Sequence, residues 1–117
     1  MLQTATVLLA LTALGGLVMA GIRFARTINP PAWLAMLHGL LASSGLTLLI
    51  YEVFTRAVPP SAILSMILFL AAAGGGGILS LAYKWQQKLL PTWLVIGHAL
   101  LAVTAFVLLL LAVKADG

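Results

Sequence analysis

Four long apolar stretches occupy most of this 117-residue chain. A transmembrane helix needs about 20 mostly apolar residues to cross the roughly 30 Å of hydrocarbon in a bilayer. The sequence therefore predicts four such helices, covering residues 2–22, 32–54, 61–83 and 91–113. Prolines stand at the start of the last three, where a missing backbone N–H is tolerated. We expect a single all-α, integral membrane four-helix bundle over residues 1–117, with no room for a soluble domain.

The composition excludes several other classes of protein. Hydrophobic residues make up 63% of the chain and charged residues 7%, whereas soluble domains are about 45–50% apolar and about 25% charged. A net charge of +4 from six Lys and Arg is too sparse for a nucleic-acid-binding surface. The absence of cysteine excludes disulfides, thiolate metal sites and iron–sulfur clusters. The expected partner is the lipid bilayer, with no nucleic acid.

The distribution of cations predicts the orientation in the membrane. The first and third connections contain four of the six cations, namely Arg23, Arg26, Lys84 and Lys88. Lys and Arg accumulate in cytoplasmic loops, so loops 23–30 and 84–90 are predicted to be cytoplasmic and both termini to lie outside. We expect the bacterial inner membrane as the location. The first apolar stretch has no cationic segment before it, so we interpret it as a retained helix rather than a signal peptide.

A repeat of 60 residues runs through the sequence. Residues 31–42 read PAWLAMLHGLLA and residues 91–102 read PTWLVIGHALLA, with Pro, Trp and His in the same places. The same offset pairs Gly15 and Gly16 with Gly75 and Gly76. We interpret the chain as a duplicated two-helix hairpin, with repeats at about 1–57 and 61–117. Because each repeat has two spans, the repeats would be parallel, related by a pseudo-twofold axis along the membrane normal.

The two histidines of the chain are the main candidates for a functional site. His38 and His98 each lie seven residues beyond the proline that opens their helix, about 10 Å inside it at 1.5 Å per residue. Two imidazoles at one depth on equivalent helices suit the axial positions of a six-coordinate haem iron. The alternative is that each histidine only hydrogen-bonds a neighbouring helix. For the free ring N–H, the carbonyls of Leu34 and Leu94 are the predicted acceptors.

Small residues and cations complete the predicted site. The positions expected to leave space for a flat ligand are Ala42, Gly45, Ala102, Ala105, Gly15, Gly16, Gly75 and Gly76. Close helix packing is an equal alternative for the glycines. Four consecutive glycines, 74–77, also predict a locally irregular third helix. Arg23 and Lys84 are the candidate partners of two haem propionates, although each cation could serve only to orient the chain.

His38 and His98, on a plan of four spans, resemble the small membrane cytochromes b, such as the cytochrome b561 type and the haem-bearing anchor subunits of succinate dehydrogenase. The resemblance implies haem b, electron transfer, and a quinone or another membrane redox subunit as partner. Because the chain has almost no extramembrane surface to recruit a soluble carrier, we also expect a homo-oligomer or membership of a larger complex. The b561 type usually has four ligating histidines for two haems, so two histidines here imply one bis-histidine haem.

Three other functions stay open at this level. Each histidine could ligate a separate chlorin, or the chain could be a structural subunit without a cofactor. A small transporter is a further alternative, but transporters of this size need a carboxylate within the membrane, and Glu52 and Asp116 lie near helix ends. No nucleophile with a partner base is evident, so the sequence indicates no hydrolytic activity.

Overall fold

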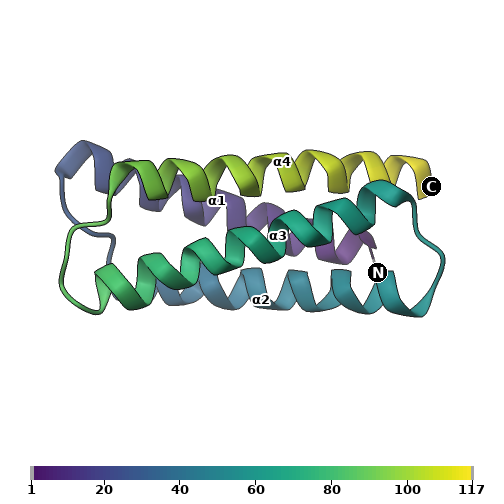
Figure 1. Ribbon diagram of the computed structural model, residues 1–117, viewed down its shortest axis with the longest axis horizontal. Helices are drawn as coiled ribbons and strands as arrows, with labels where there is room; N and C mark the ends of the chain where they lie inside the picture. The colour runs from purple at the N-terminus through teal and green to yellow at the C-terminus, as the bar shows by residue number, and fades with distance from the viewer. Residues whose placement is uncertain (1, 117) are drawn as a thin grey trace.

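The structure, a computed structural model, describes residues 2–116 as a bundle of four long helices (Figure 1). The helices are α1 (Leu2–Arg26), α2 (Ala32–Thr55), α3 (Pro60–Ile78), which continues as the π-helix η1 (Leu79–Lys84), and α4 (Thr92–Asp116). The four predicted helices are confirmed, and all four are long and apolar enough to cross a membrane. The bundle measures 43 × 19 × 18 Å, and its long axis matches the about 40–45 Å of a bilayer with headgroups.

The helix boundaries follow from local backbone chemistry. Pro31 and Pro59 hold an extended conformation just before α2 and α3, and Pro91 directly precedes α4. The predicted irregularity of the third helix is displaced from the glycines. Gly74–Gly77 remain α-helical, and the helix widens only beyond them, where the Trp85 N–H bonds the Ser80 carbonyl five residues back. Glycine in a helix interior costs roughly 0.5–1 kcal/mol relative to alanine, so the run lowers stability without breaking the helix.

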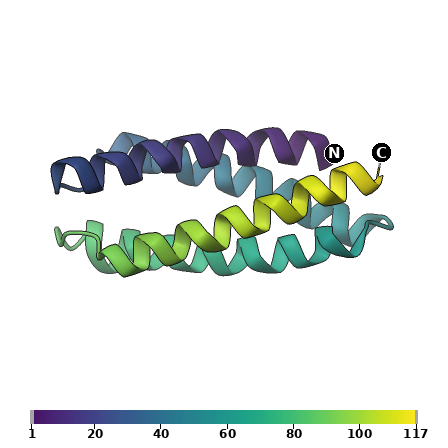
Figure 2. The ribbon, with the colours of Figure 1, turned by 90° about the horizontal axis from the view of Figure 1, so that it is seen from above.

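The helices form two hairpins that lie side by side. Helix α1 packs along α2, and α3 packs along α4. The hairpins meet where α1 contacts α4 and α2 contacts α3, so α2 and α4 occupy diagonal corners of the bundle (Figures 1 and 2). Both described ends of the chain lie at the same end of the bundle, together with the α2–α3 connection (Figure 1).

We distinguish two halves of the bundle along its length. The terminal half comprises residues 2–12, 45–72 and 105–116, and the histidine half comprises residues 13–44 and 73–104. The main hydrophobic core lies entirely in the terminal half and consists of Leu2, Ala5, Leu9, Leu49, Met66, Phe69, Ala105 and Leu109. Leu49 and Leu109 are completely inaccessible. Close packing of all four helices therefore holds this half together.

The histidine half is much more loosely packed. Its buried residues lie near the connections and include Arg23, Leu34, Leu79, Leu90 and Val95. Between them and the terminal half, the four segments 13–22, 35–44, 73–78 and 96–104 contain no buried residue. The α1–α2 hairpin and the α3–α4 hairpin diverge toward this end (Figure 2). The middle of the histidine half thus lacks the side-chain core of the other half.

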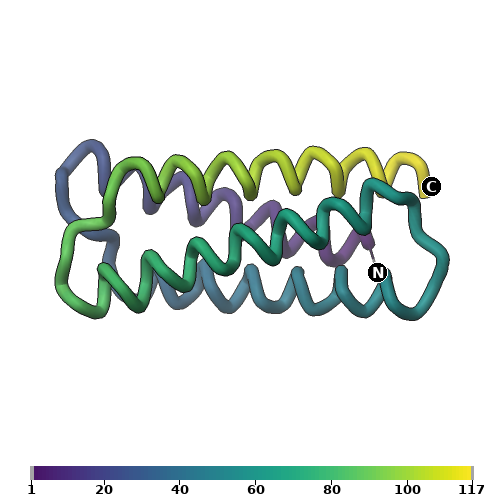
Figure 3. Tube along the Cα trace, in the orientation of Figure 1, coloured from purple at the N-terminus to yellow at the C-terminus, as the bar shows by residue number. Residues whose placement is uncertain are grey.

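The two connections at the histidine end lie side by side (Figure 3), and hydrogen bonds join them. The Asn29 amide donates to the Lys88 carbonyl at 2.7 Å and accepts the Leu90 N–H at 3.0 Å. Arg23 Nε donates to the Leu90 carbonyl at 2.8 Å, and the Lys84 ammonium donates to the Pro30 carbonyl. Each hairpin therefore holds the connection of the other, which closes the bundle outside its loosely packed segment.

An ion-pair cluster closes the opposite end. Arg56 donates two hydrogen bonds to the Asp116 carboxylate, at 3.0 and 2.8 Å, and pairs with the buried Glu52 one turn back. Hydrogen bonds with Asp116 and then with Glu52 raise the pKa of Arg56 above its usual range, so the cation persists at any physiological pH. The cluster links the end of α2 to the end of α4.

Candidate functional site

His38 of α2 and His98 of α4 face each other across the diagonal of the bundle, in the middle of the loosely packed segment. Their ring centroids are 6.3 Å apart and their ring planes are inclined by 68°. Both side chains are half-buried. The structure thus brings together two residues that are 60 residues apart in the chain.

A main-chain carbonyl of the neighbouring helix orients each imidazole. His38 Nδ1 lies 2.8 Å from the Thr12 carbonyl oxygen, and His98 Nδ1 lies 2.7 Å from the Ala72 carbonyl oxygen. A carbonyl can only accept a hydrogen bond, so Nδ1 carries a proton, and in the neutral ring the Nε2 lone pair is free. The prediction that the carbonyls of Leu34 and Leu94 accept these hydrogen bonds was wrong. The rings turn sideways to α1 and α3 instead of back along their own helices.

Two glycines make these hydrogen bonds sterically possible. A Cβ atom at Gly16 would lie 3.0 Å from His38 Cε1, and one at Gly76 would lie 3.2 Å from His98 Cε1. Both distances are tighter than ordinary contacts. Each glycine also follows its carbonyl partner by four residues, so the missing side chain uncovers that carbonyl. The space left by these glycines is therefore filled by the histidine rings themselves.

Of the remaining small residues, two pairs lie beside the histidines. Gly15 and Gly75 flank the rings, since a Cβ there would lie 3.8 and 3.7 Å from His38 Nδ1 and His98 Nδ1. The half-buried Ala42 and Ala102 stand one turn beyond the histidines.

Gly45 and Ala105, in contrast, lie in the packed terminal half. A Cβ at Gly45 would be 2.7 Å from Leu9 Cγ, and the Ala105 carbonyl accepts the buried Ser65 hydroxyl at 2.8 Å. These two positions bring helices close together, away from the histidines.

The two predicted cations lie at the histidine end but already have partners. Arg23 is only 8% exposed, and its Nε donates to the Leu90 carbonyl. This bond leaves the terminal nitrogens of its guanidinium available. Lys84 of η1 reaches the Pro30 carbonyl and lines a pocket at the side of the bundle, next to α2. The hydroxyls near the histidines, those of Ser43, Ser44 and Thr104, bond only the carbonyls four residues back on their own helices.

The geometry fits one metal ion held between the two rings. Imidazole nitrogens bind transition metals at about 2 Å, so rings on opposite sides of one ion have centroids about 6 Å apart. A neutral imidazole that donates Nδ1–H to a carbonyl is the usual form of a metal-ligating histidine. Within residues 2–116 no group of three or more His, Cys, Asp or Glu side chains could complete a site made of protein ligands alone. A macrocycle that supplies its own equatorial nitrogens needs only two further ligands, which two imidazoles can provide.

The sequence did not indicate the carbonyls of Thr12 and Ala72 as functional groups. A backbone acceptor has no residue-type signal, and only the 60-residue offset between Thr12 and Ala72, with a glycine four residues after each, marks the positions. Asn29, which joins the two connections, was also missed, because its partners are backbone groups 59 and 61 residues away.

No family model, curated protein or solved structure matches the chain.

Proposed function

We propose that this chain is a membrane-embedded haem b protein that transfers electrons, with His38 and His98 as the axial ligands of one haem. The opposed pair of histidines supports the proposal most directly, with centroids 6.3 Å apart and each Nδ1 bound to a carbonyl. The haem would supply one-electron redox chemistry at a potential set by the imidazoles and their apolar surroundings.

The proposed architecture is two parallel two-helix repeats, residues 1–57 and 61–117. Several independent features at an offset of 60 support it. The histidine hydrogen bonds join residue 38 to 12 and residue 98 to 72. The residues in the left-handed region are Thr27 and Gln87, with φ of 55° and 56°. Buried positions recur at the same offset, in the pairs 2 and 62, 5 and 65, 9 and 69, 12 and 72, 45 and 105, 49 and 109, and 52 and 112.

The residues of this chain would divide the work of holding the haem. His38 and His98 bind it, and the Thr12 and Ala72 carbonyls keep the proton on Nδ1 and so keep Nε2 available. The loosely packed segments 13–22, 35–44, 73–78 and 96–104 would be covered by the macrocycle. Arg23 can direct its free guanidinium nitrogens to a propionate. Lys84 lines the pocket at the side of the bundle next to α2, so we assign the propionate to Arg23.

The spacing of the rings favours one shared haem over two chlorins. Two macrocycles, one on each histidine, would both have to fit between rings whose centroids are 6.3 Å apart. A single macrocycle ligated from both sides needs only this distance. A structural subunit without a cofactor would leave the middle of the bundle without a core.

The proposed surroundings follow from the charges and the apolar surface. Connections 23–30 and 84–90 would face the cytoplasm of a bacterial inner membrane, with both termini outside. The electron partner would be a quinone or another membrane redox subunit, reached within the bilayer, and association with a second copy or a larger complex would supply it.

Because the chain has no cysteine, Gln86→Cys and Ala57→Cys can report the orientation. A thiol reagent that does not cross membranes should label only Ala57→Cys in intact cells.

The test of haem binding is a reduced-minus-oxidised spectrum of the purified protein from cells supplied with haem. The wild type should show a Soret band and sharp α and β bands on reduction. His38→Ala and His98→Ala should each lose the six-coordinate spectrum. For His98→Gly, added imidazole should restore it, which separates loss of a ligand from misfolding.

Ser44→Ala and Thr104→Ala are the matched controls, because both hydroxyls lie near the histidines but bond their own helices at 2.8 Å. Their spectra should equal that of the wild type. A colourless wild type, or an unchanged six-coordinate spectrum in both alanine variants of histidine, would overturn the proposal. Chlorin bands in the red after solvent extraction would favour the alternative cofactor.

A further inference from the structure

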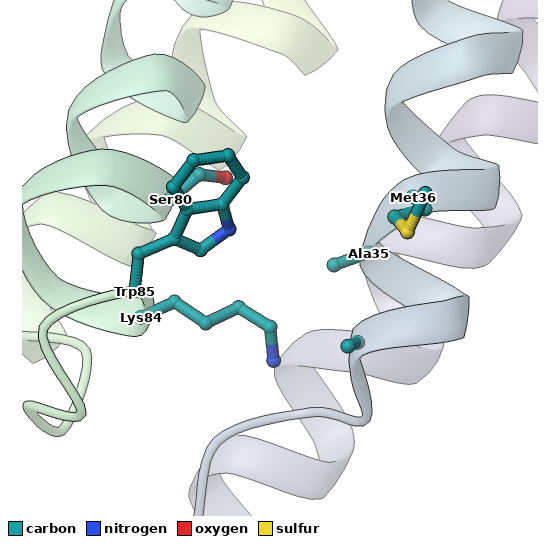
Figure 4. Close-up of a pocket in the computed structure, with 6 residues that line it drawn as sticks. Ala35, Met36, Ser80, Lys84 and Trp85 are labelled. Atoms are coloured by element: carbon teal, nitrogen blue, oxygen red, sulfur yellow. The ribbon is translucent and has the colours of Figure 1, made fainter.

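A pocket of about 210 Å³ opens at the side of the histidine half, between α2 and η1 (Figure 4). One wall is apolar and consists of Ala32, Ala35 and Met36, and the other carries the polar groups of Ser80, Lys84 and Trp85. In Figure 4, Lys84 extends from η1 toward the start of α2, while Trp85 and Ser80 lie opposite Met36 and Ala35. An apolar wall faces a row of hydrogen-bond donors.

The π-helix contributes one wall of this pocket, and the two sequence repeats differ in structure there. Leu79–Lys84 are π-helical, but the segment 60 residues earlier, Met19–Phe24, is regular α-helix. In the first half, Ala20, Phe24 and Ala25 take the places of Ser80, Lys84 and Trp85, without a charge or an indole. Short π-helical segments are rare and often stand at functional sites.

The charges around the pocket favour an anion. Lys84 uses one of its three donors for the Pro30 carbonyl, so two remain. Arg23, Arg26 and Lys88 lie at the same end of the bundle. The two acidic residues of the chain, Glu52 and Asp116, are at the other end, bound to Arg56. These cations would therefore attract an anionic group in the pocket, and neither acidic side chain is near enough to repel it.

The position of the pocket favours a lipid over a soluble anion. Met36 and Trp85 at its rim are 67% and 74% exposed on the apolar outer surface of the bundle. Tryptophan at the end of a transmembrane helix sits at headgroup level, and basic pockets between helices bind anionic headgroups. The pocket is smaller than the about 300–1,000 Å³ of sites for drug-sized ligands, so it suits part of a larger molecule.

We propose that this pocket binds the phosphate of an anionic phospholipid, with Lys84, Ser80 and Trp85 as donors and the α2 wall against the acyl chain. The site is independent of the proposed haem. It would fix a lipid between the hairpins at the point where η1 departs from α-helical geometry.

The experiment uses Trp85 as its own reporter in the full chain carrying Trp33→Phe and Trp93→Phe. The protein is placed in phosphatidylcholine vesicles that contain either brominated phosphatidylglycerol or brominated phosphatidylcholine, since bromine quenches nearby indoles. Brominated phosphatidylglycerol should quench half of the Trp85 fluorescence at a mole fraction about fivefold lower than brominated phosphatidylcholine. Lys84→Met should abolish this difference, and Lys84→Arg should retain it.

Lys88→Met is the matched control, because it removes the same charge from the same end but lies outside the pocket. It should keep the headgroup preference. Equal quenching by both lipids, or the same loss in Lys88→Met as in Lys84→Met, would overturn the proposal and indicate only a general surface attraction. Reversal of quenching by millimolar inorganic phosphate at constant ionic strength, or by an uncharged quinone, would assign the pocket to that ligand and also overturn it. Neither outcome depends on the haem spectrum.

Discussion

The terminal half and the histidine half of the bundle use the same four helices in opposite ways. In the terminal half, Leu49 and Leu109 are fully buried and the helices approach closely at Gly45. In the histidine half, small residues surround two imidazoles and the segments beside them contain no buried residue. One half has a complete hydrophobic core, and the other has a pair of oriented imidazoles without a core around them.

The difference shows how a small four-helix bundle can contain a loosely packed segment. The terminal half supplies the packing that holds the helices together, and the interlocked connections close the opposite end. The histidine half lies between these two fixed ends, so its helices stay in place without contributing a core. The packed core and the candidate site are thus separated along the bundle axis, and substitutions should affect one or the other according to their level.

The largest effect on stability should come from Leu49→Ala or Leu109→Ala. Each substitution removes contacts of a completely buried side chain, which costs about 2–4 kcal/mol of unfolding free energy. Leu41→Ala, in the histidine half, should cost much less in cofactor-free protein, because Leu41 is only half-buried and lies outside the core. Reversible unfolding in mixed micelles measures both. Equal costs would mean that the two halves are packed alike.

The features that the sequence predicted are those set by helix length and residue type. Apolarity and proline positions predicted all four spans, and the equal spacing of His38 and His98 from their prolines predicted a common depth. The rotation of a helix about its own axis is set by how the helix packs against its neighbours. A local sequence pattern does not determine that packing. The turn of His38 toward the Thr12 carbonyl and the π-helix after Ile78 were therefore found only in the structure.

The charged ends show the same limit. Glu52 was expected near a helix end and does lie there, but the sequence did not indicate that Arg56, its partner, also pairs with Asp116 at the end of α4. The interlocked connections depend on Asn29, a residue that sequence patterns treat as an ordinary turn former. In both places the unpredicted contact joins one hairpin to the other, at a sequence separation of about 60 residues.

The second-largest effect on stability should come from Gly76→Ala in α3, and the adjacent Gly77→Ala should have the opposite effect. Gly76→Ala would push a methyl group to 3.2 Å from His98 Cε1, and we expect about 1–3 kcal/mol of strain together with a displaced imidazole. Gly77→Ala meets nothing within 4 Å and should raise stability by about 0.5–1 kcal/mol, because alanine loses less entropy in a helix. Unfolding and the absorption spectrum together report this pair. A Gly76→Ala protein as stable as Gly77→Ala would show that the ring is not seated against α3.

A smaller effect should follow from removing the buried hydroxyl of the terminal half. Ser65 donates to the Ala105 carbonyl at 2.8 Å, whereas Ala5, 60 residues earlier, has no such bond to give. Ser65→Ala should lower the unfolding free energy by about 1 kcal/mol and leave the spectrum unchanged. A spectral change would indicate that packing of the terminal half is transmitted to the histidines. Ser43→Ala, which loses only a bond to its own helix, provides the control.

The smallest effect should come from the ion-pair cluster at the terminal end. Asp116→Asn removes a carboxylate that accepts two hydrogen bonds from Arg56, but this contact is exposed and salt screens it. We expect faster amide hydrogen exchange in the last turn of α4 and no change near His98. Lys114→Gln, which alters a charge in the same turn without a described ion pair, should leave exchange unchanged. The packed core between the helix end and the histidines should confine the faster exchange to the helix end. Faster exchange that extends to the histidines would show instead that the two halves are one cooperative unit.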